Sequence, residues 1–410
     1  MRIVIKKGDL IPKRREFSNR GEMFRFWACV FGLSFPGYHI GLNTLITTVI
    51  GSNSIDTLLA YGLLIGSIII AILYTPESKR QKYLKWPVIL FIGAVITLFL
   101  SQVLVPENAI VLNRIRRTFF QTACWGSLVI GLIDDKTKMK RAFRLIGYII
   151  FIMLVFEPFA SRSTLFIEAN NSWGTSGYLT WGYRMLVAAV LLLYSAFETK
   201  KKNDILFSII ASIELMLIGN RGSIVAIIVF ILMYVFFCMK PRKKIKYLAL
   251  FSGITIIGLM ILQESNLLYL EEYLASVGVK SRNLTKILND SITDSGRDAG
   301  YNIAINYIKS GNYFGLGVGG DHRLVGNYPH NIVLELMLQY GNFMGIILFT
   351  WLVRQSIICL VRCKDKEWNA IFVTCFCLAI VKLWFSSTYW YELWFWAYIM
   401  LIINTRKKFT

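Results

Sequence analysis

The chain has 410 residues, of which 55% are hydrophobic, with a mean hydropathy of +0.54 and a formal net charge of +21. These values exclude a soluble globular protein, because a water-soluble fold cannot bury so much apolar side chain. The charge could indicate a nucleic-acid partner, but the basic clusters sit in every second segment between long apolar runs. That distribution is typical of cytoplasmic loops, so we expect a membrane protein with no nucleic-acid partner.

The apolar runs predict an all-α polytopic membrane protein with about twelve transmembrane helices. Each run can cross a hydrocarbon core of about 30 Å as a helix. We expect residues 1–262 to hold nine helices, residues 263–330 to form one large, partly helical extracytoplasmic loop, and residues 331–410 to hold the last three helices. The predicted spans are 23–40, 55–74, 86–105, 117–133, 143–160, 178–197, 204–219, 223–239, 246–262, 331–353, 368–385 and 389–405.

The basic residues predict that both ends of the chain lie in the cytoplasm. The expected cytoplasmic segments are rich in Lys and Arg, whereas the segments on the opposite face are much poorer. The sequence "NRIRR" at 113–117, most of which falls within the expected outer loop 106–116, is the one exception to this rule. The expected cytoplasmic segments are 1–22, 75–85, 134–144, 198–203, 240–245, 354–367 and 406–410.

The long loop 263–330 contains two predicted helices. The sequences "NLLYLEEYLASVG" and "RDAGYNIAINYIKSG" both have helical apolar spacing. We expect the second to be an amphipathic helix on the outer membrane surface. Aromatic residues near this surface, among them Tyr389 and Trp390, are expected to form an interfacial belt. A structured extracytoplasmic loop of this size usually carries a function.

The segment "GLGVGG" at 315–320 fits the G-x-G-x-x-G pattern of dinucleotide-binding folds. Such a fold needs a preceding buried strand, a following helix and access to cytosolic nucleotide. Here we expect a surface helix before the segment, a loop after it and the wrong compartment around it. We therefore interpret the glycines as a tight turn that places the neighbouring histidines.

His330 is the first candidate for a general base. It lies in "YPHNIVLEL", where Pro329 restricts Tyr328 to an extended conformation and suits the first turn of a helix. This places His330 at the outer N-terminal end of the tenth predicted helix, where the helix dipole favours a neutral imidazole. A neutral imidazole can accept a proton. The alternative interpretation of His330 is a histidine at the membrane interface that hydrogen bonds to loop carbonyls.

Four further residues are accessory candidates: Asp321, His322, Arg323 and Glu335. His322 follows Asp321 in "GGDHRLVG" and could assist binding, but a solvated loop histidine explains the pattern equally well. Glu335 lies little more than one turn beyond His330, so it could orient the imidazole or simply pair with Lys382.

Two arginines are expected at the outer face. Arg221 lies in "LIGNRGSIVAI", a short hairpin, and its planar guanidinium can bind a phosphate through two hydrogen bonds. The alternative for Arg221 is snorkelling to lipid headgroups. Arg297 begins the amphipathic helix, where its charge opposes the helix dipole, and a bound anion would relieve that conflict. Both are candidate ligands of a phosphate or another anion.

Three segments together resemble the superfamily of O-antigen ligases and Wzy-type polysaccharide polymerases. "GLGVGG" followed by "YPHNIVLELMLQYGNFMGIILF" resembles the family pattern of a G-x-G turn, Pro-His-Asn and a helix with Glu and G-x-x-G. "GNRGSIVAI" resembles the family's Ser-Arg-Gly hairpin, with Asn220 in place of the usual serine. "SGRDAGYNIAI" resembles the family's loop segment before the glycine turn. The motifs cover residues 220 to 350.

The resemblance implies a metal-independent, inverting glycosyltransferase with its active site at the outer face of the bacterial cytoplasmic membrane. His330 would take the proton of the acceptor hydroxyl, and Arg221 and Arg297 would bind the pyrophosphate of the donor, without a cofactor. The implied partners are undecaprenyl-pyrophosphate-linked oligosaccharides as donor and acceptor, and membrane lipids. A chain-length regulator and a flippase are further candidate partners.

Three functions stay open at this point. A polymerase joins lipid-linked repeat units into O-antigen, capsule or exopolysaccharide, a ligase transfers a finished glycan to another acceptor, and a flippase or transporter moves the substrate without chemistry. We prefer the polymerase, because the Lys-, Ile- and Asn-rich composition is typical of low-GC bacteria, and ligation to lipopolysaccharide would not apply to a Gram-positive one. A transporter would show internal repeats and broken helices near the bilayer midplane.

Overall fold

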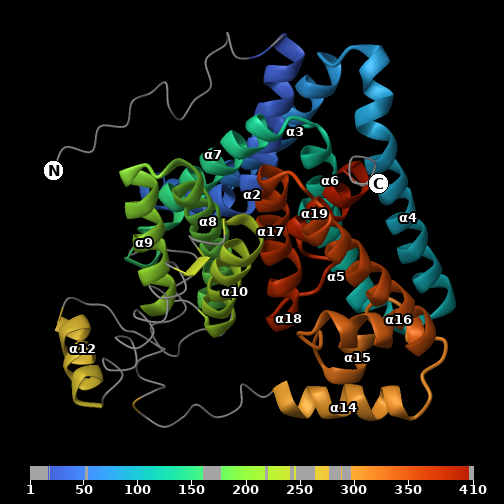
Figure 1. Ribbon diagram of the computed structural model, residues 1–410. Helices are drawn as coiled ribbons and strands as arrows, with labels where there is room; N and C mark the ends of the chain where they lie inside the picture. The colour runs from blue at the N-terminus through green and yellow to red at the C-terminus, as the bar shows by residue number, and fades with distance from the viewer. Residues whose placement is uncertain are drawn as a thin grey trace. The chain divides into compact units, whose positions relative to one another are not determined.

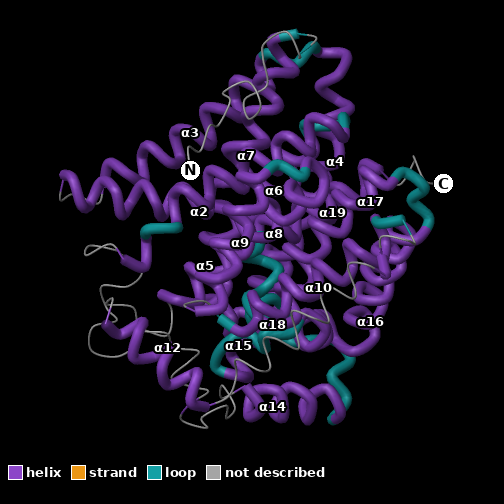
Figure 2. The backbone as a smooth tube through the Cα atoms, turned by 60° about the vertical axis from the view of Figure 1, so that its left-hand side comes forward, coloured by secondary structure: helices purple, strands orange, loops and turns teal. Residues whose placement is uncertain are grey.

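The computed structural model describes residues 19–50, 54–159, 177–217, 220–240, 264–276 and 297–405, with the isolated residues 17, 244, 245 and 288. Within these ranges the chain consists of helices joined by loops, and no strand is present (Figure 1, Figure 2). The expected all-α class is therefore confirmed. The expected span 246–262, the tail 406–410 and most of the tail 1–22 lie outside the described residues.

The helices follow the predicted spans closely in position. Each expected span other than 246–262 overlaps at least one helix. The described helices are α2 (Arg20–Ile50), α3 (Ser54–Leu73), α4 (Glu77–Leu104), α5 (Ala109–Thr118), α6 (Cys124–Gly131), α7 (Lys136–Leu154), α8 (Gly177–Thr199), α9 (Lys202–Leu217), α10 (Arg221–Cys238), α12 (Glu264–Ser276), α14 (Arg297–Lys309), α15 (Gly320–Val325), α16 (Ile332–Val361), α17 (Lys366–Phe376), α18 (Lys382–Phe385) and α19 (Leu393–Thr405).

Six described helical segments are long and apolar enough to cross a membrane, which makes the chain a multi-pass membrane protein. Other expected spans are too short, since α9 has 16 residues and α19 has 13, whereas a span needs roughly 20. The expected number of twelve spans therefore stays a prediction. The six segments are Ile55–Leu73, Glu77–Leu104, Leu179–Thr199, Arg221–Cys238, Ile332–Val361 and Lys366–Phe385.

The chain divides into two compact units. Helices α2, α3 and α7 contribute residues to both, and the division of α2 falls at Pro36, where a helix loses one backbone donor. Unit 1 comprises Met1–Leu10, Pro36–Tyr61 and Phe143–Thr293. Unit 2 comprises Ile11–Phe35, Gly62–Ala142 and Asp294–Thr410.

In unit 1, a buried carboxylate joins the middle of α7, the end of α8 and the start of α9. Asp204 is fully buried in the first turn of α9. It accepts hydrogen bonds from the hydroxyls of Tyr148 at 2.6 Å and Ser195 at 2.7 Å, and it pairs with Arg144 at 3.0 Å. A buried charge is tolerated only when it is paired and hydrogen bonded in this way. The cluster therefore locks these three helices together.

In unit 2, α6 and α19 pack at very short range. Gly126 permits this approach, because a Cβ there would collide with the carbonyl of Leu393. Residues 119–123 form a π-helical turn, so that 109–131 is helical throughout. The expected outer loop 106–116 is thus mostly helical, and the expectation of a loop was wrong because α5 begins directly after the turn at Pro106–Asn108.

Both helices expected between residues 263 and 330 are confirmed, as α12 and α14. In unit 2, α14 lies across the end of α16 and also contacts α15 (Figure 1). Its fully buried Ala304 faces this contact, and Gly300 lies against Val325 of α15. Ile303 and Ile305 point outward and are 44% and 37% exposed. The helix is therefore a packed part of unit 2 with an apolar outer face.

Candidate active site

Helix α16 is broken at Gly341, near its N-terminal end. Gly341 has φ 84° and ψ 163°, a conformation that is costly for a residue with a side chain. A Cβ at this position would also collide with the carbonyl of Tyr313. The break leaves backbone carbonyls of the preceding turn without their helical partners.

The glycine-rich loop supplies those missing partners. The backbone N–H groups of Leu316 and Gly317 donate to the carbonyls of Leu338 at 2.8 Å and Gln339 at 3.0 Å. The approach is so close that a Cβ at Gly315 would collide with the carbonyl of Gln339. The loop and the broken helix therefore form one interlocked structure.

This interlock explains the G-x-G-x-x-G segment without a nucleotide. Gly315, Gly317 and Gly319 have φ values of 77°, 71° and 83°, which the docked loop requires and which glycine adopts without strain. The expectation of a loop after the glycines was wrong, because Gly319 is the N-cap of the short helix α15. No strand precedes the segment within the described ranges, so a dinucleotide fold is absent there. The glycines position α15 against α16.

A buried glutamine joins two acidic side chains of the site. Gln339 Nε2 donates to Asp321 Oδ1 at 2.9 Å and to Glu335 Oε1 at 3.3 Å. Gln339 Oε1 accepts from the hydroxyl of Tyr389 at 2.6 Å and from Trp390 Nε1 at 3.1 Å. All five side chains are 4% exposed or less. The amide thus uses its full hydrogen-bonding capacity, and it ties α15, α16 and the segment before α19 together.

Glu335 has neither of the roles expected for it. It accepts hydrogen bonds from Thr388 Oγ1 and from Gln339, whereas Lys382 Nζ pairs with Glu392 Oε2 at 2.5 Å. No hydrogen bond links Glu335 to His330 in the part of the chain that the structure describes. The expectations that Glu335 pairs with Lys382 or orients His330 directly were therefore wrong. The carboxylate of Glu335 instead lies against Gln339 and Thr388.

His322 is buried on α15, so the alternative of a solvated loop histidine is wrong. Its Nε2 lies 4.0 Å from Asp321 Oδ2, and neither atom has a hydrogen-bond partner among the described residues. Burial, with a smaller effect of Arg114, lowers the pKa of His322 to about 4. Burial raises the pKa of Asp321 to about 7. Unpartnered polar atoms at such depth are costly unless a bound molecule completes them.

His330 lies just before α16 and not inside its first turn. The helix begins at Ile332 with Asn331 as its N-cap, so the expected place of Pro329 in the first turn was wrong. The backbone of His330 has φ 52°, an uncommon conformation for a residue with a side chain and one that often marks a functional site. The imidazole lies against the ring of Tyr328, with ring centroids 4.4 Å apart.

The imidazole of His330 is neutral at physiological pH. Burial is the largest cause, and the charge of Arg297 adds to it, so that the pKa of His330 falls to about 4. Its Nδ1 has no hydrogen-bond partner among the described residues. The neutral state agrees with the expectation, although burial and not the helix dipole is its main cause. A negative charge placed beside Arg297 would raise this pKa again.

Arg297 is the first residue of α14, as the sequence predicts. Its Nη1 donates to the carbonyl of Phe385 at 2.8 Å. A guanidinium has five N–H donors, so most of them stay available. Arg297 lies near enough to lower the pKa of His330, and it therefore belongs to the same site.

Arg221 belongs to unit 1, whereas the other candidates belong to unit 2. It is the first residue of α10, and its side chain is exposed. Asn220, which stands where the family pattern has serine, is the N-cap and accepts from the backbone N–H of Ser223 at 2.8 Å. Arg221 and Arg297 thus occupy equivalent first positions of two helices.

Three features of the site were missed in the sequence. Arg114 of α5 lies near enough to lower the pKa of His322, and its signal was the "NRIRR" exception to the charge rule. Gln339 lies four residues after Glu335, on the same face of a helix. Tyr389 and Trp390 are buried in the network, so an interfacial belt was the wrong expectation for them. Arg323, the remaining accessory candidate, lies on α15 with an exposed side chain.

The fold and the site define a multi-pass membrane protein with a polar site that combines neutral histidines, buried carboxyl groups and an arginine at a helix N-terminus. Within the described ranges no group of three or more His, Cys, Asp and Glu side chains could hold a metal ion.

Residues 206–350 match the family model described as O-Antigen ligase, so this segment is an O-antigen ligase family domain. The match confirms the resemblance indicated by the motifs, and its range includes Arg221, Arg297, His330 and Glu335. The family implies ligase- or polymerase-type glycan processing with lipid-linked glycan substrates. No curated protein and no solved structure gives a significant match to the chain.

Proposed function

We propose that the chain is a polysaccharide polymerase that joins undecaprenyl-pyrophosphate-linked oligosaccharide repeat units at the outer face of the bacterial cytoplasmic membrane. The observation that carries this proposal is a neutral His330 with an unpartnered Nδ1 beside Arg297. The O-antigen ligase family domain supports the substrate class. A flippase and a chain-length regulator would be its working partners.

The proposed reaction is a single displacement at the anomeric carbon of the donor. The hydroxyl oxygen of the acceptor forms the new glycosidic bond, and the bond between the anomeric carbon and the pyrophosphate oxygen breaks. The polyprenyl pyrophosphate leaves with the electron pair, and the hydroxyl proton passes to His330. The leaving group gains negative charge, which Arg297 and Arg221 would stabilise.

Donor binding would also prepare His330 as a base. In the free protein, burial and the charge of Arg297 keep the pKa of His330 at about 4, which is too low for efficient proton abstraction at neutral pH. A pyrophosphate bound at Arg297 offsets that charge and raises the pKa of the imidazole. Asp321 and Glu335 would be positioning residues in this scheme, because Gln339 joins them and so holds α15 against α16. His322 lies near enough to lower the pKa of His330, and the exposed Arg323 would be a further contact for an anionic substrate.

The test is transfer by a His330→Ala variant in proteoliposomes that contain a lipid-pyrophosphate-linked oligosaccharide. Loss of the proton acceptor should slow polymer formation by about 10²–10⁴-fold without a change in membrane insertion or thermal unfolding. The matched control is His39→Ala in α2, which should give the normal ladder of products. A normal ladder from His330→Ala would remove the imidazole from the mechanism.

Ligation is the second candidate, and the description of the matching family as O-Antigen ligase favours it. The same reconstitution separates the two functions by their products. A ladder of lengths indicates a polymerase, and a single transfer of intact glycan to a second acceptor indicates a ligase. Movement of the lipid-linked glycan across the bilayer without a new bond would contradict both.

A further inference from the structure

A cavity of about 810 Å³ lies in unit 2, remote from His330. It opens between α4, α6, α16, α17 and α19. Its residue Gln355 follows the break at Gly341 by about four turns of α16. The cavity therefore lies toward the other end of the helix that begins next to His330.

Gln355 is the unusual residue of this cavity. Its side chain is 1% exposed, and neither Nε2 nor Oε1 has a hydrogen-bond partner among the described residues. The side chain lines the cavity. An unpartnered buried amide is costly, so its place on the cavity wall indicates that a bound molecule completes it. That molecule must both donate and accept hydrogen bonds, as a hydroxyl group does.

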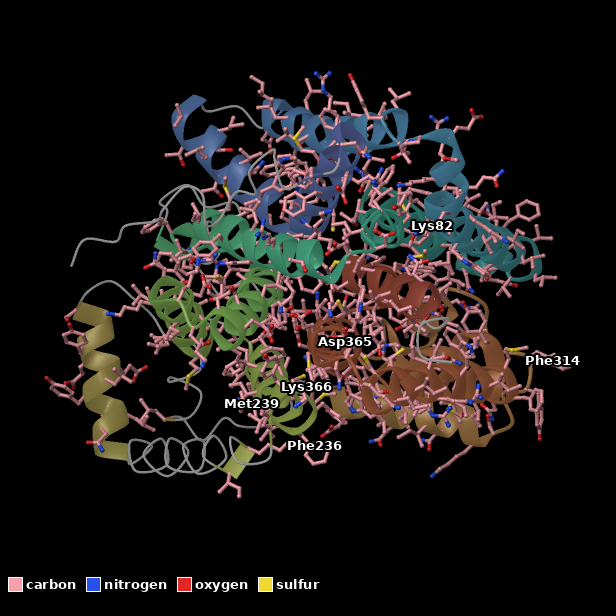
Figure 3. The ribbon with its side chains drawn as sticks, turned by 45° about the horizontal axis from the view of Figure 1, so that its top comes forward. Lys82, Phe236, Met239, Phe314, Asp365 and Lys366 are labelled. Atoms are coloured by element: carbon pink, nitrogen blue, oxygen red, sulfur yellow. The ribbon has the colours of Figure 1, made fainter. Side chains whose placement is uncertain are left out.

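The rest of the cavity is amphipathic. Trp86 and Trp351 are 37% and 39% exposed, and Trp368 is buried. The polar side is formed by Lys82 of α4 (Figure 3), which pairs with Asp134 at 2.7 Å. An ammonium group has three N–H donors, so Lys82 keeps others for a ligand. Tryptophans beside a charged group are typical of the boundary between headgroups and hydrocarbon.

The surface around the cavity shows which kind of molecule can reach it. The partly exposed Trp86 and Trp351 of the cavity wall belong to α4 and α16, which are apolar enough to span a membrane. Such a surface faces hydrocarbon, so a molecule that enters from this side comes from the bilayer. Lys79, Lys82 and Lys85 in the first turns of α4 favour a negatively charged headgroup.

We propose that this cavity binds an anionic glycerophospholipid with a hydroxylated headgroup, of the phosphatidylglycerol class. Its phosphate lies at Lys82, a headgroup hydroxyl exchanges hydrogen bonds with the Gln355 amide, and its acyl chains leave past Trp86 and Trp351. This site is separate from the glycan chemistry at His330.

The experiment is native mass spectrometry of the delipidated full-length protein with phosphatidylglycerol or phosphatidylcholine of identical acyl chains. Phosphatidylcholine carries a phosphate but no hydroxyl and no net charge. The wild-type protein should retain phosphatidylglycerol about tenfold better, the preference that one or two specific hydrogen bonds provide. Equal retention of the two lipids would overturn the proposal.

Variants assign the preference to the cavity. Gln355→Leu should abolish the preference and should not lower the melting temperature of the lipid-free protein, because it removes an unpartnered buried amide. Lys82→Gln should weaken binding of the anionic lipid. The control Gln121→Leu makes the same chemical change at an exposed position of 119–123 and should leave the preference intact. An unchanged preference in Gln355→Leu would contradict the site.

Discussion

The two ends of unit 2 differ in how their titratable side chains are partnered. At the site end, Asp321 Oδ2, His322 Nε2 and His330 Nδ1 have no partner among the described residues. At the other end, charged side chains are paired. Asp365, which precedes α17 (Figure 3), pairs with Lys136 at 2.6 Å, and similar pairs join the starts of α7 and α17.

This difference separates what stabilises the fold from what receives a ligand. The ion pairs at the other end need no further charged group, because their charges neutralise each other. The site end holds neutral histidines and the Arg297 guanidinium, which the proposed donor pyrophosphate and acceptor hydroxyl would satisfy. Variants at the two ends should therefore affect different measurements.

The largest expected effect is on transfer, from Arg297→Ala. In the proposed reaction the Arg297 guanidinium would stabilise the leaving pyrophosphate, so its removal should lower the rate of glycosyl transfer by about 10²–10³-fold. Arg297→Lys should recover part of this loss, because an ammonium keeps the charge but not the planar fork. The matched control is Lys309→Ala at the exposed last residue of α14. An equal loss in Lys309→Ala would mean that α14 responds only as a structural element.

A similarly large effect on stability is expected from Gln339→Leu. The substitution leaves Asp321, Glu335, Tyr389 and Trp390 each short of one hydrogen-bond partner. The free energy of unfolding should fall by about 3 kcal/mol or more, since each buried unsatisfied group costs about 1–3 kcal/mol. Thermal unfolding in detergent measures the change. An unchanged melting temperature would mean that the network is not a structural lock.

A smaller effect on the pH dependence of stability is expected from Asp321→Asn. The pKa of Asp321 is raised by burial from an ordinary 3.8 to about 7. Between these values the folded protein holds a proton that the unfolded chain has released, so this contribution to stability is lost as pH rises from about 4 through about 7. His322 and His330, with pKa values lowered from 6.5 to about 4, act in the opposite direction, because the unfolded histidines become protonated as pH falls through 6.5.

Asparagine keeps the acceptor for Gln339 but cannot ionise. Both proteins contain the same histidines, so the difference in melting temperature between the wild-type protein and Asp321→Asn isolates the Asp321 carboxyl. This difference should move against the wild-type protein as pH rises from about 5 to about 8. A difference that does not change with pH would contradict the raised pKa of Asp321.

The sequence predicted the features that depend on local pattern. Apolar runs located the helices, and the spacing in "RDAGYNIAINYIKSG" located α14 with Arg297 at its start. The motif around His330 located the site, because proline, histidine and asparagine lie next to each other in the chain. Such features need no knowledge of distant residues.

The features that depend on distant contacts could not be predicted. The break at Gly341 needs the glycine loop to dock on it, and the burial of His322 needs α15 to pack on α16. The partners of Glu335 include Thr388, far away in the chain. An acidic residue one turn from a histidine looks like its orienter, and only the packed structure shows a different partner.

The smallest effect is expected at the paired end, from Lys140→Met. Lys140 pairs with Glu367 at 2.9 Å, and Glu367 keeps Lys136 at 2.9 Å as a second partner. Partly exposed ion pairs contribute little, so the free energy of unfolding should fall by less than about 1 kcal/mol, and high salt should reduce the difference further. Glycosyl transfer should stay at the wild-type rate. A loss of transfer as large as that of Arg297→Ala would mean that the paired end takes part in the reaction and that the two ends of unit 2 do not divide their roles.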